Sequence, residues 1–205
     1  MKKYELTSET KIVFGHILYR IKALSSFGYV SAGDLGGFLE SEKNLSQNGN
    51  AWVSGNARVY GNAEVSGNAE VYGSARVSGN AEVYGNARVS GSAEVSGNAR
   101  VYGSAEVSGS AEVYGNARVS GNAEVSKIGS IFWIGAVGSR NDTATFFRCT
   151  DGVVRVTCGC FFGNLDEFAK KVRKTHGDND HAKVYMLAID MAKIRISTEK
   201  EKTEE

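Results

Sequence analysis

The side chains best suited to bind a ligand lie in the C-terminal third of the chain and carry guanidinium or amide groups: Arg140, Asn141, Arg148 and Arg155. A guanidinium group offers hydrogen-bond donors in a fixed plane that matches carboxylates and phosphates. A site built from such groups would bind a small anion, for example a nucleotide-like molecule. We assign no catalytic residue.

A predicted β-hairpin positions two of these arginines. Its strands cover residues 143–150 and 153–161, and Asp151-Gly152 between them is typical of a two-residue type I′ turn. In that register Arg148 faces Arg155 on the side opposite the core. Two facing arginines repel one another unless an anion or a carboxylate lies between them. The alternative is a pair of splayed, solvated arginines.

The cysteines and histidines do not form a recognisable metal site. Cys158 and Cys160 are separated by one residue in a predicted strand, so their thiols point to opposite faces, whereas structural zinc sites favour two to four intervening residues. Nothing in the sequence places Cys160 beside His176 as a catalytic pair. We therefore predict no metal and no cofactor. Three cysteines do not indicate a disulfide framework, which favours a cytoplasmic protein with reduced thiols.

A long run of six-residue repeats precedes this region. The unit Gly-(Asn/Ser)-Ala-(Glu/Arg)-Val-(Ser/Tyr) extends over residues 49–126, with alanine at every sixth position from 51 to 123 and valine from 53 to 125. Residues two apart in a strand point to the same side, so alanine and valine share an inner face. One short strand cannot bury that face alone, and stacked coils are expected.

This pattern resembles the hexapeptide-repeat left-handed β-helix family, in which three units form one triangular coil of 18 residues. The resemblance implies a left-handed parallel β-helix of four to five coils and, because trimers are common in that family, a homotrimer. Leu39 and Leu45 share the phase of the alanines and predict an irregular first coil. Acyltransferases of this family use a histidine base and loops that interrupt the coils. Residues 49–126 contain no histidine, cysteine, lysine or inserted loop, so an acyltransferase is an alternative that we do not favour.

An 18-residue coil would stack the Glu/Arg positions in three columns on the outer faces. Of the nine charged neighbours in these columns, four are of opposite sign and five are alike. Like charges directly opposed are mildly destabilising, so the columns are not optimised within one chain. Either these faces are simply solvated, or a second chain supplies counter-charges in the trimer.

The predicted fold is mainly β and has four parts. Residues 1–48 form a β cap with a two-residue hairpin loop at Gly15-His16, residues 49–126 form the β-helix, residues 127–196 form a small α+β module, and residues 197–205 form a charged, disordered tail.

Two helices are predicted in the C-terminal module. The first is opened by a capping box of Asn164 and Glu167 and ends at Gly177. The second runs from near Asp180 to about Lys193 and buries apolar side chains such as Val184, Leu187, Ala188 and Met191.

Both terminal modules resemble segments of uncharacterised bacterial and phage hexapeptide-repeat proteins. The N-terminal likeness rests on residues 33–40 and 44–46, and the C-terminal likeness rests on the runs 134–141, 145–147, 151–152, 158–161, 165–168 and 175–177. The resemblance implies module boundaries and no activity.

The net charge of +1 predicts no bulk attraction to nucleic acid or anionic membranes, and no apolar stretch is long enough to span a bilayer. We therefore expect a non-enzymatic trimeric scaffold that presents a C-terminal ligand-binding module. A phage-encoded protein that sequesters a small anionic, nucleotide-like ligand fits this design. A purely structural or assembly protein is the second alternative.

Overall fold

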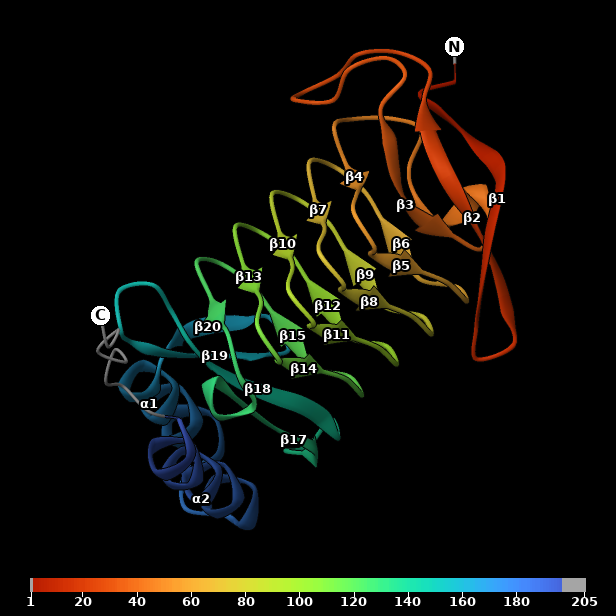
Figure 1. The fold of residues 1–205 in the computed structure, drawn as a ribbon. Helices are drawn as coiled ribbons and strands as arrows, with labels where there is room; N and C mark the ends of the chain where they lie inside the picture. The colour runs from red at the N-terminus through yellow and green to blue at the C-terminus, as the bar shows by residue number, and fades with distance from the viewer. Residues whose placement is uncertain (1, 197–205) are drawn as a thin grey trace, which may run out of the picture.

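A computed structural model describes residues 2–196 and shows a parallel β-solenoid whose two ends are covered by antiparallel strands (Figure 1). A helical pair follows at the C-terminal end. No helix among these residues is both long and apolar enough to cross a membrane.

The solenoid is built from two-residue strands that stack in register in three columns. Val59 pairs with Val77 and Val77 pairs with Val95, so each coil contains 18 residues, as the family resemblance implied. The strands are β4 (Trp52–Val53), β5 (Arg58–Val59), β6 (Glu64–Val65), β7 (Glu70–Val71), β8 (Arg76–Val77), β9 (Glu82–Val83), β10 (Arg88–Val89), β11 (Glu94–Val95), β12 (Arg100–Val101), β13 (Glu106–Val107), β14 (Glu112–Val113), β15 (Arg118–Val119) and β16 (Glu124–Val125).

The interior of the solenoid is a continuous stack of alanine and valine side chains. Every repeat alanine and valine between Ala51 and Val125 is fully buried. The corners need glycine for two reasons: Gly79 has a φ of +69°, and a Cβ at that position would lie 3.0 Å from the backbone of Gly97 in the next coil. Asparagine side chains link the coils outside two of the corners: Asn68 donates to Asn86 at one, and Asn80 donates to Asn98 at the other, both at 3.0 Å.

The N-terminal end is extended by three longer strands, β1 (Tyr4–Val13), β2 (His16–Ala23) and β3 (Leu35–Leu39). The predicted Gly15-His16 loop is wrong by one residue, because Val13 pairs with His16 and the loop is Phe14-Gly15. Both loop residues have positive φ, 48° and 84°, as a type I′ turn requires. His16 is therefore the first residue of a strand.

The first coil is irregular, as predicted, but its phase differs from the prediction. Leu39 pairs with Val59 and Leu45 bridges to Val65, so both leucines extend valine columns. The coil is longer than 18 residues because twenty positions separate Leu39 from Val59. Gly37 takes the alanine position, where an added Cβ would lie 2.7 Å from the carbonyl oxygen of Ala57.

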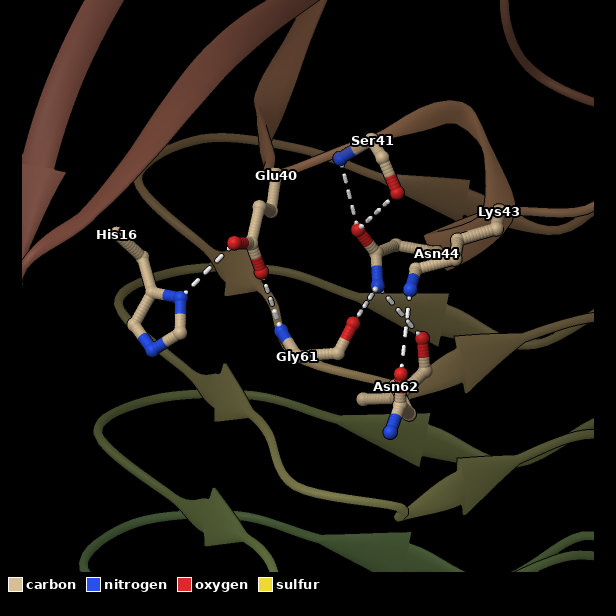
Figure 2. Close-up of polar contacts among 8 residues, drawn as sticks. His16, Glu40, Ser41, Lys43, Asn44, Gly61 and Asn62 are labelled. Atoms are coloured by element: carbon tan, nitrogen blue, oxygen red, sulfur yellow. Dashed lines mark hydrogen bonds and ion pairs between the residues drawn. The ribbon is translucent and has the colours of Figure 1, made fainter.

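Side chains complete the hydrogen bonding at this edge (Figure 2). In the regular coils a backbone N–H of the preceding coil donates a hydrogen bond to each corner carbonyl; Asn62 N, for example, donates to Gly79 O at 2.7 Å. At the edge, Asn44 Nδ2 donates to Gly61 O at 3.1 Å and to Ala63 O at 2.9 Å. Asn44 belongs to the short 3₁₀ helix Glu42–Asn44.

Two further side chains close the same edge. Glu40 accepts a hydrogen bond from Gly61 N at 2.6 Å, and its other carboxylate oxygen lies 2.9 Å from His16 Nδ1 (Figure 2). The buried Lys3 ammonium donates to Ala51 O at 2.9 Å, and burial lowers the pKa of Lys3 to about 8. The exposed strand edge that invites end-to-end aggregation is therefore covered.

An antiparallel sheet covers the C-terminal end. It contains β17 (Ile131–Val137), β18 (Asp142–Arg148), β19 (Val154–Cys158) and β20 (Phe161–Asn164), and the 3₁₀ helix Ile128–Ser130 leads into it. Phe147 packs on the solenoid core, whereas Phe146 packs on the helices α1 (Leu165–His176) and α2 (Asp180–Arg195). Both faces of β18 are therefore buried. A hydrogen bond also joins this sheet to the solenoid, because Arg118 N of β15 donates to Thr145 Oγ1 at 3.0 Å.

The register of the β18–β19 hairpin differs from the prediction by one residue. Phe147 pairs with Arg155, and Arg148 pairs with Val154. The loop has three residues, because Cys149 N donates to Val153 O at 3.0 Å. Only Gly152 in this loop has a positive φ, 78°, whereas a type I′ turn requires two such residues.

The helices confirm the predicted boundaries but not the predicted buried face of α2. Asn164 and Glu167 form the capping box, with two reciprocal hydrogen bonds of 2.9 Å, and Gly177 is the C-cap of α1. Ala188 is buried as expected, but Val184, Leu187 and Met191 are exposed. The face of α2 that packs is rich in alanine and consists of Ala182, Tyr185, Ala188, Ile189 and Ala192.

Candidate functional site

A pocket of about 360 Å³ lies between the β17–β18 loop, the β19–β20 turn and helix α1. The loop contributes Ser139 and Arg140, and the turn contributes Cys158, Cys160 and Phe161. Helix α1 supplies Phe168, Lys171, Val172, Thr175 and His176, and α2 supplies Tyr185. Its volume is within the range of about 300–1,000 Å³ that is usual for small-molecule sites.

The β17–β18 loop is shaped by residues with positive φ. Ala136, Gly138 and Asn141 have φ values of 55°, 69° and 51°. A Cβ on Gly138 would collide with the hydroxyl of Tyr185, so glycine lets the loop approach α2 closely. This packing holds Arg140 at the mouth of the pocket.

The Arg140 guanidinium lies over the β19–β20 turn. A Cβ added to Gly159 would lie 2.5 Å from Arg140 Nη2 and 3.5 Å from Asp142 Oδ2. The missing side chain at Gly159 therefore makes room for the guanidinium group. The guanidinium therefore lies close to the turn, where it can donate to an anionic ligand.

The pocket is basic at its rim and neutral at its floor. Its eleven lining residues include Arg140, Lys171 and His176 but no aspartate or glutamate. At the floor the Tyr185 hydroxyl lies 3.6 Å from Cys158 Sγ and 3.5 Å from Val137 O. Burial raises the pKa of both the Cys158 thiol and the Tyr185 hydroxyl, so these groups stay protonated at neutral pH and remain hydrogen-bond donors.

Of the four residues predicted to bind a ligand, only Arg140 lines this pocket. Asn141 follows it in the loop and is not among the lining residues. Arg155 donates two hydrogen bonds, of 2.8 and 2.6 Å, to Asp151, and this contact lowers the pKa of that carboxyl to about 2. Arg148 is 8 % exposed and lies 3.7 Å from Glu124 of the solenoid. Arg148 and Arg155 therefore do not face each other.

The sequence reasoning missed Lys171, Thr175 and His176. These side chains border the face of α1 on which Phe168 and Val172 are buried. A helical wheel drawn from the sequence places all five residues on one side of the helix and could have identified them. Cys160, which had no apparent link to His176 along the chain, lines the same pocket. Among residues 2–196 no group of three or more His, Cys, Asp or Glu side chains is arranged to hold a metal ion.

The outer faces of the solenoid have the predicted columns of charge. All four neighbours of opposite sign form ion pairs: Arg76–Glu94, Arg100–Glu82 at 3.0 Å, Arg88–Glu106 at 3.4 Å and Arg88–Glu70 at 3.8 Å. Like charges are stacked elsewhere, as in the pairing of Arg58 with Arg76. The only stacked tyrosine rings among the described residues are those of Tyr84 and Tyr102, 5.1 Å apart, so the tyrosines form no continuous aromatic stripe.

Comparison with known proteins identifies the repeat region alone. A family model described as YdcK Beta solenoid repeat matches residues 51–67, 81–95, 93–109 and 111–126. No curated protein matches the chain. The matched segments lie within the stacked coils and include neither the N-terminal strands nor the C-terminal module. The central region of the chain is thus similar to a known β-solenoid repeat family, in agreement with its fold.

Proposed function

We propose that the chain is a non-enzymatic scaffold, a left-handed and trimeric β-solenoid, that presents a C-terminal pocket for a small anionic, nucleotide-like ligand. The observation that carries this proposal is the basic rim formed by Arg140, Lys171 and His176 around a pocket without acidic lining residues. Such a rim attracts anions, and the guanidinium group can bind a phosphate with two hydrogen bonds.

The remaining lining residues suit the rest of such a ligand. Phe161 and Phe168, whose ring centroids are 5.1 Å apart, give the pocket an aromatic wall. A planar base or another flat apolar group can pack on such a wall. The Tyr185 hydroxyl proton is directed to Val137 O, so the hydroxyl oxygen and the Cys158 thiol are the polar groups that would face a polar edge of the ligand. A phosphate joined to a flat heterocycle therefore fits the lining chemistry best.

The solenoid would act by holding several pockets at a fixed spacing. Three copies in a trimer would bind a multivalent or abundant ligand with higher avidity than one pocket alone. A cytoplasmic, phage-encoded protein that sequesters a nucleotide-like signal is the role that we propose for this design. The stacked coils contain no histidine, cysteine or lysine, which weighs against acyl transfer on the solenoid faces.

Calorimetric titration with a panel of mononucleotides, cyclic nucleotides and inorganic pyrophosphate tests the proposal. At least one of these probes should bind to the wild-type protein, and Arg140→Ala and Lys171→Ala should each weaken binding by about tenfold or more, the usual loss for a charge-assisted hydrogen bond. Arg155→Ala is the matched control, because this arginine is held by Asp151 away from the pocket.

Two results would contradict the proposal. One is the absence of binding across the whole panel at millimolar concentration. The other is equal weakening by the Arg140 and Arg155 variants, which would indicate non-specific attraction to positive charge. Turnover of acyl-CoA by the wild-type protein would instead favour the acyltransferase alternative.

A further inference from the structure

Helix α2 has a second apolar face that the fold leaves exposed. This α2 ridge consists of Val184, Leu187, Met191 and Ile194, with Leu187 64 % and Ile194 87 % exposed. The spacing of three, four and three residues places all four side chains on one narrow stripe, the arrangement that is typical of a helix packing on another element. Single exposed apolar residues are common in soluble proteins, but a continuous stripe of them indicates a contact surface.

An aromatic groove lies beside the α2 ridge. It has a volume of about 380 Å³ and is lined by Tyr114 of the solenoid, by Ile128, and by Phe132 and Trp133 of β17. Tyr114 and Trp133 meet edge to face, with ring centroids 4.5 Å apart. Met191 of the ridge also lines this groove, so a protruding apolar surface and an apolar recess are continuous. A ridge and a recess on one surface make that surface complementary to a second copy of itself.

The groove also contains one acidic and one basic residue, Glu112 and Arg195. None of the ion pairs within residues 2–196 includes either of them. The stacked neighbour of Glu112 is Glu94, which is already paired with Arg76. A second copy would bring its own Arg195 toward Glu112, so that opposite charges would face each other across the contact.

We propose that the α2 ridge of one copy docks in the aromatic groove of a second copy of this chain. The occupant is a second copy because the same surface supplies the ridge, the groove and both charges. Residues 197–205, Ser-Thr-Glu-Lys-Glu-Lys-Thr-Glu-Glu, contain no apolar side chain and so cannot provide an apolar cover for the ridge. This inference rests on the homo-oligomer of the proposed function and names its contact.

Sedimentation velocity of the full chain over a concentration series tests the contact. The variants Leu187→Lys and Ile194→Lys place a charge on the ridge, and both positions are exposed, so the fold should tolerate them. Each should raise the dissociation constant of the oligomer by about tenfold or more, as the loss of a central apolar contact does. Ile12→Lys is the matched control, because Ile12 is 73 % exposed on β1 at the other end of the molecule.

A charge exchange provides a second test. Glu112→Arg alone should weaken association by about tenfold, because it places two cations at the contact, and adding Arg195→Glu to the same chain should restore most of the loss. Circular dichroism of each variant should match the wild type.

The outcomes separate this inference from the proposed function. A wild-type protein that stays monomeric at 100 times the concentration used for ligand titration would overturn both the trimer and the contact. A wild-type oligomer that is insensitive to Leu187→Lys and Ile194→Lys would overturn the α2 contact alone. A dimer that dissociates in these two variants would support the contact and contradict the trimer.

Discussion

Substitution of Asn44 tests whether side-chain capping holds the first coil of the solenoid in place. Asn44 is fully buried, and its Nδ2 donates to Gly61 O and Ala63 O at 3.1 and 2.9 Å, while its Oδ1 accepts from Ser41 N at 2.9 Å. Asn44→Ala removes these three hydrogen bonds and a fourth, which Ser41 Oγ donates to Oδ1 at 3.3 Å, and it leaves the two carbonyls and the Ser41 N–H without their partner.

The magnitude follows from the number of groups left unsatisfied. Each hydrogen bond contributes about 0.5–1.5 kcal/mol net, and a buried group left without a partner costs about 1–3 kcal/mol. Water can reach part of this edge, so we expect a loss of about 2–4 kcal/mol in the free energy of unfolding. Asn44→Asp should cost at least as much, because it replaces the donating amide with a carboxylate oxygen that faces two carbonyl oxygens.

Urea denaturation followed by circular dichroism measures this loss. Asn98→Ala is the matched control, since Asn98 is exposed and its amide bonds only to Asn80 and Asn116 outside a corner. Its expected cost is below about 1 kcal/mol. The capping argument would be refuted by a loss at Asn44 no larger than that at Asn98, or by an aspartate variant as stable as the wild type.

Three other predictions follow from the described contacts. Gly138→Ala should destabilise the C-terminal module by about 2 kcal/mol or more and abolish ligand binding, because φ is positive there and the new Cβ meets the Tyr185 hydroxyl; denaturation and calorimetry measure the two effects. The pKa of Glu40 is lowered mainly by its hydrogen bond to His16, so the ionised carboxylate should stabilise the fold above pH 4.5, and this contribution should be lost as the pH falls through the lowered pKa. Glu40→Gln should therefore flatten the acid side of a plot of unfolding free energy against pH. Arg88→Ala should lower the free energy of unfolding by less than about 1 kcal/mol despite two ion pairs, because the Arg88 guanidinium is exposed in both, and this loss should shrink in 1 M NaCl.

The stacked coils could be predicted from the sequence almost residue by residue. A strict six-residue period with in-phase alanine and valine fixes the inner face, and the 18-residue coil implied by the family resemblance then determines that Arg76 meets Glu94 and that Arg100 meets Glu82. The period says nothing about the direction in which the coils wind. That property was inferred from the family resemblance alone.

The C-terminal module was less predictable because its details depend on tertiary packing. The β18–β19 register depends on whether one or two loop residues take positive φ, and Asp151-Gly152 is compatible with either. In α2 the alanine-rich face packs, because small side chains let the helix approach the sheet closely, whereas hydrophobicity alone favoured the larger side chains of the other face. The pocket itself joins residues from four separate elements, and no local pattern brings Lys171 to Arg140.

The equivalence of the three solenoid columns leads to a last prediction. The inner alanines and valines are the same in every column, and the outer charges that differ contribute little free energy. Deleting residues 73–90 removes one coil and should preserve the fold, while bringing the two ends closer by about 4.8 Å. Deleting residues 73–78 should preserve the fold as well, because the remaining units restack with the same core. It removes one third of a coil, so the N-terminal strands should turn about the solenoid axis from one of its three faces to the next, relative to the C-terminal module.

The comparison of these two deletions tests where copies of the chain meet. Both the α2 ridge and the aromatic groove lie at the C-terminal end, so both deletion variants should associate as the wild type does. Loss of association in the six-residue deletion alone would mean that the contact also involves the N-terminal strands and depends on the face to which they point. Unfolding of that variant would instead refute the equivalence of the columns, and it would assign to the corner asparagines and outer charges a larger share of the stability than their exposure implies.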